Sequence, residues 1–245
     1  MRVTRIHVDA SLQAGAELAL PEQAAAHVAR VLRLRPGDPL MLFNGDGNDY
    51  AAELITVAPR DARARVLDRR LNPGESPLRI TLAQALARGE KMDWIVQKAT
   101  ELGVSGIVPL VTARSEVKLD ESRARKRLEH WQGVAISACE QSGRARVPVI
   151  APVQRLDEWL SALDESAPAT RLALLPEGET AARELREIAG AVVLAIGPEG
   201  GFDENDSARL REAGFKGLRL GPRVLRTETA GMAAIAALQA LYGDF

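Results

Sequence analysis

From residue 78 onward the chain alternates between short apolar runs and stretches with helical periodicity, and this alternation limits the possible folds most. The apolar runs lie at 78–86, 106–112, 147–153, 171–176, 191–198 and 217–222, and the helical stretches at 91–103, 120–143, 156–163, 180–190, 203–214 and 229–243. Such alternation predicts an α/β domain with a mostly parallel sheet. The continuous apolar run AVVLAI indicates a sheet that is covered on both faces.

The first 70 residues follow a different pattern. Strands are expected at 5–10, 39–43, 50–57 and 62–70, with a helix at 21–34. The sequence Gly45-Asp46-Gly47 begins like a dinucleotide-binding motif, but a strand follows it, so we expect a hairpin turn there. The segment Leu71–Pro77 carries two prolines and a glycine, which predicts a boundary between a β-rich domain at 1–72 and an α/β domain at 73–245.

The composition excludes several classes of protein. No stretch approaches the ~18 apolar residues of a membrane span, and the first residues do not form a secretory signal, so we expect a cytoplasmic protein. Cys139 is the only cysteine, and His7, His27 and His130 are far apart in sequence, which leaves no recognisable metal site. A net charge of −1 argues against coating nucleic acid by bulk charge, although a local basic groove stays compatible with it.

Two loops near the C-terminus are the strongest candidates for a ligand site, because parallel sheets bind ligands beyond the carboxyl ends of their strands. The first, IGPEGGFDEND, has Gly197, Gly200 and Gly201 between a strand and a helix, where backbone can approach a ligand closely or can simply turn. The second, LGPRVLRTETAGM, precedes the last helix. There Thr229 could serve as a helix cap, and Arg226 and Glu228 could form a surface pair.

These loops resemble those of the RsmE family of the SPOUT methyltransferase superfamily. The matching residues are Gly197 to Phe202, Leu220-Gly221 and Val224 to Ala230, and further upstream Lys91 to Val104, Arg114-Ser115-Glu116 and Ala135 to Arg144. The resemblance implies an N-terminal PUA-like or OB-like RNA-binding domain and a C-terminal methyltransferase domain with a parallel sheet and a deep trefoil knot. It also implies a homodimer.

The activity that the resemblance implies is methylation of N3 of a uridine in 16S ribosomal RNA of the small ribosomal subunit, with S-adenosyl-L-methionine as cofactor and no metal. The implied cofactor contacts are Leu175, Pro176, Glu177, Ile196, Gly197, Pro198, Glu199, Gly200, Gly201, Leu220, Gly221, Val224, Leu225, Arg226, Thr229 and Ala230. The N3 proton must leave as the methyl group arrives. We expect Arg226 to orient the base or stabilise negative charge, and Glu228 to act as an orienting partner or as the base.

The candidate RNA contacts come from both domains. Arg30, Arg33 and Arg35 are the preferred contacts in the first domain, although a solvated face would have the same pattern. The resemblance adds Arg114, Glu140, Gln141 and Arg144, of which the last three also suit the exposed end of a long helix.

Three alternative functions fit parts of the sequence. Another SPOUT enzyme would methylate a ribose 2′-hydroxyl or a different base. A non-catalytic RNA-binding assembly factor would bind structured RNA without the cofactor. A nicotinamide-dependent enzyme is disfavoured, because GxGxxG is missing from the first strand-to-helix turn.

Overall fold

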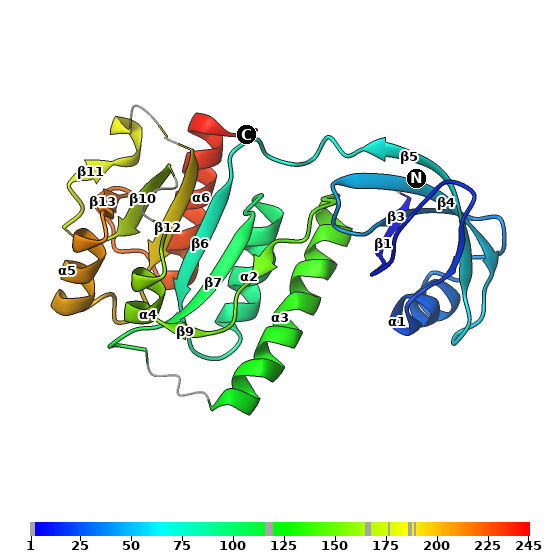
Figure 1. The fold of residues 1–245 in the computed structure, drawn as a ribbon, viewed down its shortest axis with the longest axis horizontal. Helices are drawn as coiled ribbons and strands as arrows, with labels where there is room; N and C mark the ends of the chain where they lie inside the picture. The colour runs from blue at the N-terminus through cyan, green and yellow to red at the C-terminus, as the bar shows by residue number, and fades with distance from the viewer. Residues whose placement is uncertain (1–2, 116–119, 165–167, 176, 186–187, 189) are drawn as a thin grey trace. The chain divides into compact units, whose positions relative to one another are not determined.

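The computed structural model describes residues 3–115, 120–164, 168–175, 177–185, 188 and 190–245. The chain forms two compact units (Figure 1). The first contains residues 1–75 and 139–147, and the second contains residues 76–138 and 148–245. The chain therefore enters the first unit twice.

The first unit is a five-stranded sheet with one short helix. Its strands have the order β1-β3-β4-β5-β2, with β1 and β3 parallel and the other pairs antiparallel. The elements are β1 (Thr4–His7), β2 (Glu17–Ala19), α1 (Glu22–Ala26), the π-helical turn η1 (His27–Val31), β3 (Pro39–Phe43), β4 (Asn48–Thr56) and β5 (Arg63–Leu71). The expected strands and helix of this region are confirmed, as is the hairpin that joins β3 to β4.

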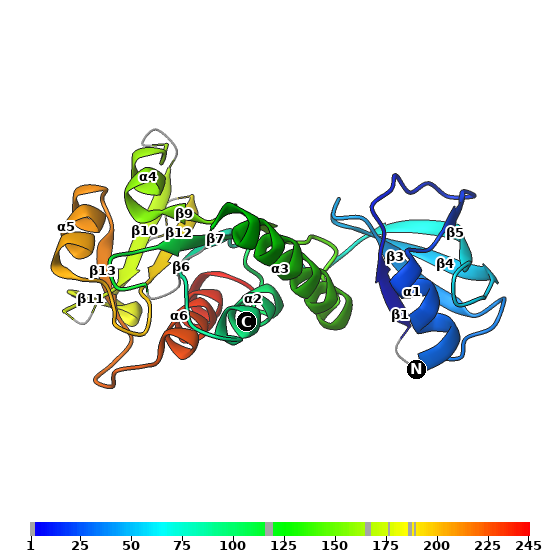
Figure 2. The same ribbon diagram turned by 90° about the horizontal axis from the view of Figure 1, so that it is seen from below.

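One face of this sheet packs on α1 and η1. Ala25 and Val28 are fully buried in the same core cluster as Ile6, Leu40 and Leu54. Figure 2 shows α1 lying over the strands of this unit. Apolar residues of the strands alternate with exposed ones, as β5 shows with its buried Ala64 and Val66. This hydrophobic burial is the main favourable contribution to folding of the unit.

The second segment of the first unit, Cys139–Val147, comes from the end of a long helix and the turn after it. Cys139 and Ala145 are buried against Phe43 of β3. Arg144 is 5% exposed and forms an ion pair of 3.0 Å with Glu75, whose other carboxylate oxygen accepts the backbone N–H of Ala145. Burial raises the pKa of the Cys139 thiol to about 12.

The second unit is a parallel sheet with helices on its two faces. Its sheet has the order β11-β13-β10-β12-β6-β7-β8, with β9 also paired to β7, and every pair is parallel. Its strands are β6 (Ile80–Ala85), β7 (Gly106–Val111), β8 (Val149–Ile150), β9 (Gln154–Arg155), β10 (Ala169–Leu174), β11 (Thr180–Ala181), β12 (Ala191–Ile196) and β13 (Lys216–Arg219). Its helices are α2 (Lys91–Glu101), α3 (Glu121–Ser142, whose last four residues belong to the first unit), α4 (Leu156–Ser161), the 3₁₀ turn η2 (Ala182–Glu184), α5 (Glu204–Glu212) and α6 (Thr227–Tyr242).

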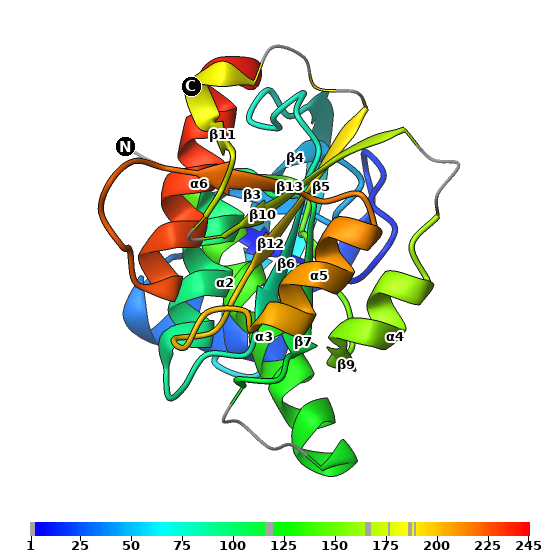
Figure 3. The same cartoon turned by 90° about the vertical axis from the view of Figure 1, so that its left-hand side faces the viewer.

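Both faces of this sheet are covered, as the apolar strands predicted. Ala83, Ala173 and Ala195 belong to a core cluster that includes buried residues of α4 and α5. Leu82 and Leu194, which point to the opposite face, are also fully buried. Figure 3 shows α2, α3 and α6 on that side and α4 and α5 on the other. The expected α/β domain with a parallel sheet is confirmed, whereas the trefoil knot stays a prediction.

Two expectations for the second unit are wrong in detail. The described part of the predicted helix at 180–190 forms β11 and η2, because Thr180 and Ala181 pair with Leu218 and Arg219 of β13. The predicted strand at 147–153 is reduced to β8, which lies between Pro148 and Pro152, where proline cannot donate to a sheet. Within the described residues, no helix is both long and apolar enough to cross a bilayer.

Candidate functional site

A cavity of about 250 Å³ lies beyond the carboxyl ends of three adjacent parallel strands, β13, β10 and β12. The loops that leave these strands form its walls, together with the start of α6. This is the position at which open parallel sheets bind ligands. The lining residues are Leu174, Leu175, Ile196, Gly197, Pro198, Glu199, Gly201, Leu218, Arg219, Leu220, Gly221, Pro222, Arg223, Val224, Leu225, Thr227 and Ala230.

The structure brings most of the predicted cofactor contacts together around this cavity. Both loops that the sequence singled out contribute to the lining, and so does Leu175, after β10, which the resemblance added. Glu177, Gly200, Arg226 and Thr229 belong to the same loops but do not line the cavity, and Pro176 lies outside the described residues. The residues that sequence reasoning missed are Leu174, Leu218, Arg219, Pro222, Arg223 and Thr227.

The loop after β12 turns so tightly that its first glycine has no room for a side chain. A Cβ atom on Gly197 would lie 2.9 Å from the backbone nitrogen of Phe202 and 3.0 Å from the carbonyl carbon of Gly201. Phe202, in contrast, is buried in the core shared with α5. The loop therefore exposes its backbone to the cavity while its last residue anchors it to the domain.

The start of α6 is tied to this loop by a buried hydrogen-bond chain. Thr227, which is 5% exposed, donates its hydroxyl to the carbonyl of Gly197 at 2.6 Å. The same hydroxyl accepts a bond of 2.9 Å from Nε2 of Gln84, a fully buried residue of β6 that also donates to the carbonyl of Ala85. Three segments far apart in sequence are thus held together beside the cavity.

A second link between the same segments is ionic. Nζ of Lys91, at the start of α2, lies 2.9 Å from Oε1 of Glu199 and 3.5 Å from Oε2 of Glu228. The backbone N–H of Arg88 also donates to Glu199 Oε1 at 3.1 Å. Oε2 of Glu228 is buried and makes no hydrogen bond to any residue that the structure describes.

Helix α6 begins earlier than the sequence suggested, and this changes two interpretations. Its N-cap is Arg226 rather than Thr229, which lies in the first turn, so the capping role expected for Thr229 is wrong. Glu228 pairs with Lys91 and not with Arg226, so the surface pair considered from the sequence is not formed. The Arg226 side chain is exposed and has no hydrogen bond or ion pair with the described residues.

Arg114 lies against the glycine-rich loop from the other side. Its guanidinium donates to the carbonyl of Gly200 at 2.8 Å. The turn that carries Arg114 is held in turn by Asp206 of α5, whose carboxylate accepts the backbone N–H of Ala113. Burial raises the pKa of Asp206, since it outweighs that hydrogen bond. Arg114 therefore supports the loop in this structure, whatever its role toward RNA.

Comparisons with known proteins agree with this geometry. A family model described as an RNA methyltransferase domain matches residues 74–239, and one described as an RNA methyltransferase PUA domain matches residues 20–67. The chain is 33% identical to the ribosomal RNA small subunit methyltransferase E of Buchnera aphidicola subsp. Schizaphis graminum, over 99% of this chain and 98% of that protein. It belongs to the ribosomal RNA small subunit methyltransferase E family.

Other members of the methyltransferase E family are equally similar. The protein of that name from Mycobacterium bovis is 34% identical, over 96% of this chain and 90% of the relative. The crystal structure of the Neisseria gonorrhoeae member, bound to S-adenosyl methionine, superposes with a TM-score of 0.94 at 40% identity and full coverage of both chains. The resemblance inferred from the sequence motifs is therefore confirmed over the whole chain.

The PUA model of this family covers the three arginines that the sequence proposed as RNA contacts. Arg30, Arg33 and Arg35 are all exposed, at and just after η1. Arg33 has a φ of 53°, a left-handed conformation uncommon for a residue other than glycine. Val31 and Leu32 between them are 66% and 38% exposed, so cationic and apolar groups share one surface.

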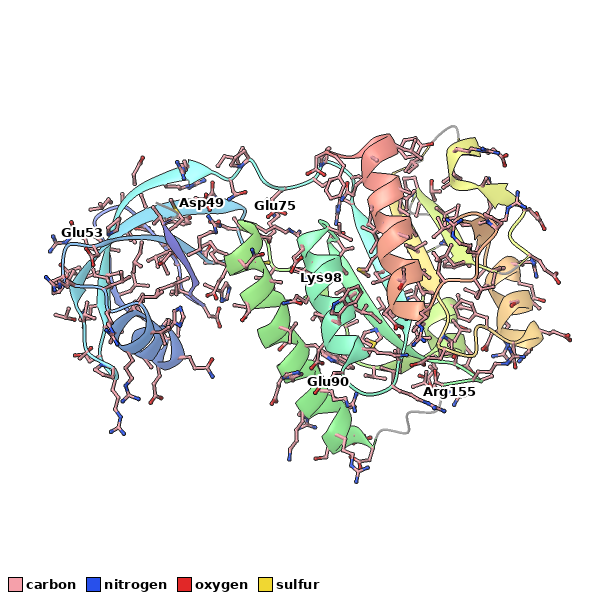
Figure 4. The ribbon with its side chains drawn as sticks, turned by 180° about the vertical axis from the view of Figure 1, so that it is seen from behind. Asp49, Glu53, Glu75, Glu90, Lys98 and Arg155 are labelled. Carbon is pink, nitrogen blue, oxygen red and sulfur yellow. The ribbon has the colours of Figure 1, made fainter. Side chains whose placement is uncertain are left out.

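The other predicted RNA contacts in the first unit have protein partners. Glu140 accepts the backbone N–H of His7 at 3.0 Å, and burial raises the pKa of this carboxyl. Arg144 is buried against Glu75, which Figure 4 labels. Gln141 is exposed. As for metals, no group of three or more potential ligands comes together within the described residues.

Two polar residues near the cavity were missed by sequence reasoning in this methyltransferase E chain. Gln84 carried one signal that could have revealed it, because it is an amide in a mostly apolar strand, and a buried amide needs hydrogen-bond partners. Lys91 belongs to a motif that matched the family, but its partners are more than a hundred residues away in sequence. No local pattern indicates such a contact.

Proposed function

We propose that this protein transfers the methyl group of S-adenosyl-L-methionine to N3 of a uridine in 16S ribosomal RNA of the small ribosomal subunit. One observation carries the proposal: the backbone-lined cavity adjoins Arg226 and Glu228 at the start of α6. Membership of the methyltransferase E family supports ribosomal RNA as the substrate. The cofactor is supported by the similar structure from Neisseria gonorrhoeae, which contains S-adenosyl methionine.

The residues around the cavity suit this cofactor. Leu175, Ile196, Leu218 and Leu220 offer apolar surface to a flat adenine ring, and the glycine-containing loops leave backbone N–H and C=O groups to pair with polar atoms. The side chain of Glu199 adds a carboxylate that can face an ammonium group. When bound, S-adenosyl-L-methionine supplies an electrophilic methyl group on a sulfonium centre.

We assign Glu228 as the group that takes the proton from uridine N3. As N3 forms its bond to the methyl carbon, the N3–H bond must break and its proton must move to an acceptor. Oε2 of Glu228 is a carboxylate oxygen without a hydrogen bond to the described residues, although Lys91 lies 3.5 Å away. The Glu228 side chain as a whole is 19% exposed, and we assign its carboxylate as the acceptor of the N3–H of a base that docks at the start of α6.

Arg226 has the complementary role. Loss of the N3 proton leaves negative charge on the uracil ring and its two carbonyl oxygens. A guanidinium can donate to such oxygens and stabilise that charge. Since Arg226 is exposed and has no bonding partner among the described residues, its guanidinium is available to the substrate.

The reaction is tested by product analysis. The pure protein is incubated with labelled S-adenosyl-L-methionine and unmodified small ribosomal subunits, and the RNA is digested to nucleosides for mass spectrometry. We expect 3-methyluridine. Another methylated nucleoside would contradict the N3 assignment and favour a different SPOUT reaction. Failure to transfer label to subunits, precursor particles or naked RNA would favour a non-catalytic RNA-binding factor.

The role of Arg226 makes a separate prediction. A charged hydrogen bond contributes about 1.5 to 3 kcal/mol, so Arg226→Ala should slow methylation by roughly ten- to a hundredfold. Arg211→Ala, an exposed arginine of α5, is the matched control and should keep full activity. A loss below about twofold in single-turnover rate would remove Arg226 from the mechanism.

The oligomeric state and the location belong to the same proposal. We expect a homodimer, as the family resemblance implies, and the Val224 side chain at the cavity, which is 99% exposed, is accessible to such a contact. A monomer mass at micromolar concentration in analytical ultracentrifugation would contradict this. We also expect a cytoplasmic location, because the proposed substrate is ribosomal RNA.

A further inference from the structure

Lys91 contacts both walls of the cavity without lining it. It is the first residue of α2 and follows Glu90, which Figure 4 labels at the start of that helix. Glu199 stands on the loop after β12, and Glu228 stands in the first turn of α6. One ammonium group therefore connects the two segments that must keep a fixed spacing if they are to hold a cofactor and a base.

The contact to Glu199 is the stronger of the two. Glu199 Oε1 accepts from both Lys91 Nζ and the backbone N–H of Arg88. Although burial acts in the opposite direction, these hydrogen bonds lower the pKa of Glu199, and the bond to Glu199 raises the pKa of Lys91. The pair is thus fully charged at neutral pH.

The contact between Lys91 and Glu228 places the positive charge of Lys91 beside a second carboxylate. Glu228 Oε2 is buried, and Lys91 is the cation that approaches it. The side chains of Lys91, Glu199 and Glu228 are 31%, 31% and 19% exposed, so solvent screens the three charges only in part. Without the ammonium group, two carboxylates would stand on facing segments with no cation between them.

We infer that Lys91 is a positioning residue for the methyl transfer: its ammonium group holds the Glu199 loop and the first turn of α6 at a fixed spacing. The cavity walls and the Glu228 carboxylate are then in place before the cofactor and the RNA arrive. Such preorganisation accelerates a reaction without any contact to the reacting atoms. This inference rests on the function proposed above.

The test compares three changes at this cluster. Cofactor affinity is measured by calorimetry with S-adenosyl-L-methionine, and kcat and KM are measured separately on small ribosomal subunits. Lys91→Met should weaken cofactor binding by about three- to tenfold and lower kcat by a similar factor, with little change in KM for RNA. Lys91→Arg keeps the cation and should recover most of both losses.

The double variant Lys91→Met with Glu228→Gln, measured by cofactor affinity, separates charge from packing, because Glu228 is not among the residues that line the cavity. Removing one carboxylate relieves the repulsion, so the double variant should bind the cofactor better than Lys91→Met alone. Lys98→Met is the matched control, since Lys98 lies on the same helix and pairs with Glu101 at 2.8 Å (Figure 4). It should leave both affinity and kcat unchanged.

Two results would overturn the inference. Wild-type affinity and kcat in Lys91→Met would show that the ammonium group positions nothing. A double variant no better than Lys91→Met would show that Lys91 contributes packing and not charge. If the wild-type protein itself neither binds the cofactor nor methylates RNA, the proposed function fails, and the role of Lys91 fails with it.

Discussion

Thr227 links the cavity to the interior of the domain through a single hydroxyl group. Thr227→Val keeps the shape of the side chain but leaves the Gly197 carbonyl and the Gln84 amide without this partner. Because unpaired buried polar groups are costly, we expect the free energy of unfolding to fall by about 1 to 3 kcal/mol and cofactor affinity to fall with it. Urea denaturation and calorimetry measure these effects.

A double-mutant cycle checks that the effect comes from the network. Gln84→Met removes the Gln84–Thr227 hydrogen bond from the side of β6, so the double variant should lose less stability than the sum of the two single variants. Additive losses would mean that Thr227 and Gln84 act independently.

Glu140 makes the stability of the first unit depend on pH. Burial raises its pKa above the unfolded value, so the native state binds this proton more tightly than the unfolded chain does. The contribution of Glu140 to stability is therefore fully present below the unfolded pKa and is lost as pH rises through the folded pKa. Glu140→Gln keeps an oxygen that can accept the His7 N–H but removes the charge.

We expect Glu140→Gln to gain stability relative to the wild type as pH rises from about 4 to 8. Urea unfolding of both proteins across this range gives the difference directly. A difference that stays constant with pH would show that the Glu140 carboxyl does not titrate abnormally in the native state.

At the scale of elements, two glycines in open space should respond in opposite ways to alanine. Gly133 lies inside α3 with nothing within 4 Å of an added Cβ, so Gly133→Ala should stabilise the protein by about 0.5 to 1 kcal/mol. Gly214 follows the C-cap of α5 and has a φ of 80°, and an added Cβ there also has open space. Gly214→Ala should destabilise by about 1 kcal/mol, because alanine is strained in that conformation.

Chemical denaturation of the two variants tests this contrast. Equal effects of the two substitutions would mean that backbone conformation is not what distinguishes the positions. Neither glycine lines the cavity, so methylation activity serves as a check that both variants stay folded.

The elements with strong periodicity could be predicted from the sequence, and the short ones could not. The long helix α3 and the apolar strands β6 and β12 have local hydrophobic patterns that are sufficient to predict them. The strand β2 has three residues and β11 has two, which is too short for any alternation. β11 also interrupts a helical composition, since pairing with β13 there overrides local propensity.

The candidate site also has one part that could be predicted from the sequence and one part that could not. The loops of the cavity could be predicted, because the carboxyl ends of parallel strands meet at one edge of a sheet and glycine marks close turns. The contacts that Gln84 and Lys91 make to α6 could not, because they depend on how α6 packs against the sheet. The true start of α6 at Thr227 was missed for a related reason: its N-cap is an arginine whose side chain forms no capping hydrogen bond.

For the whole molecule, the arginines of the first unit predict how RNA binding responds to salt. Replacing Arg30 and Arg35 by alanine and Arg33 by asparagine, which tolerates a φ of 53°, removes three cations without straining the turn. We expect weaker RNA binding and a salt dependence reduced by about two to three counterions. Cofactor affinity should not change.

Filter binding over a range of salt concentrations measures this slope. Arg65→Ala is the control, because Arg65 lies in the same unit but pairs with Glu17 and Glu53. If the triple variant keeps the wild-type slope, the RNA contacts lie elsewhere on the protein.

The double entry of the chain into the first unit has a consequence for how the protein is made. A ribosome synthesises residues 1–75 first, yet Phe43 packs on Cys139 and Ala145, and Glu75 pairs with Arg144, all of which are synthesised later. The usual order, in which an N-terminal domain is complete before the next begins, is therefore not available to this chain. The first unit stays incompletely folded until residues 139–147 have been synthesised. During that interval residues 76–138 emerge from the ribosome, and the nascent chain exposes apolar surface.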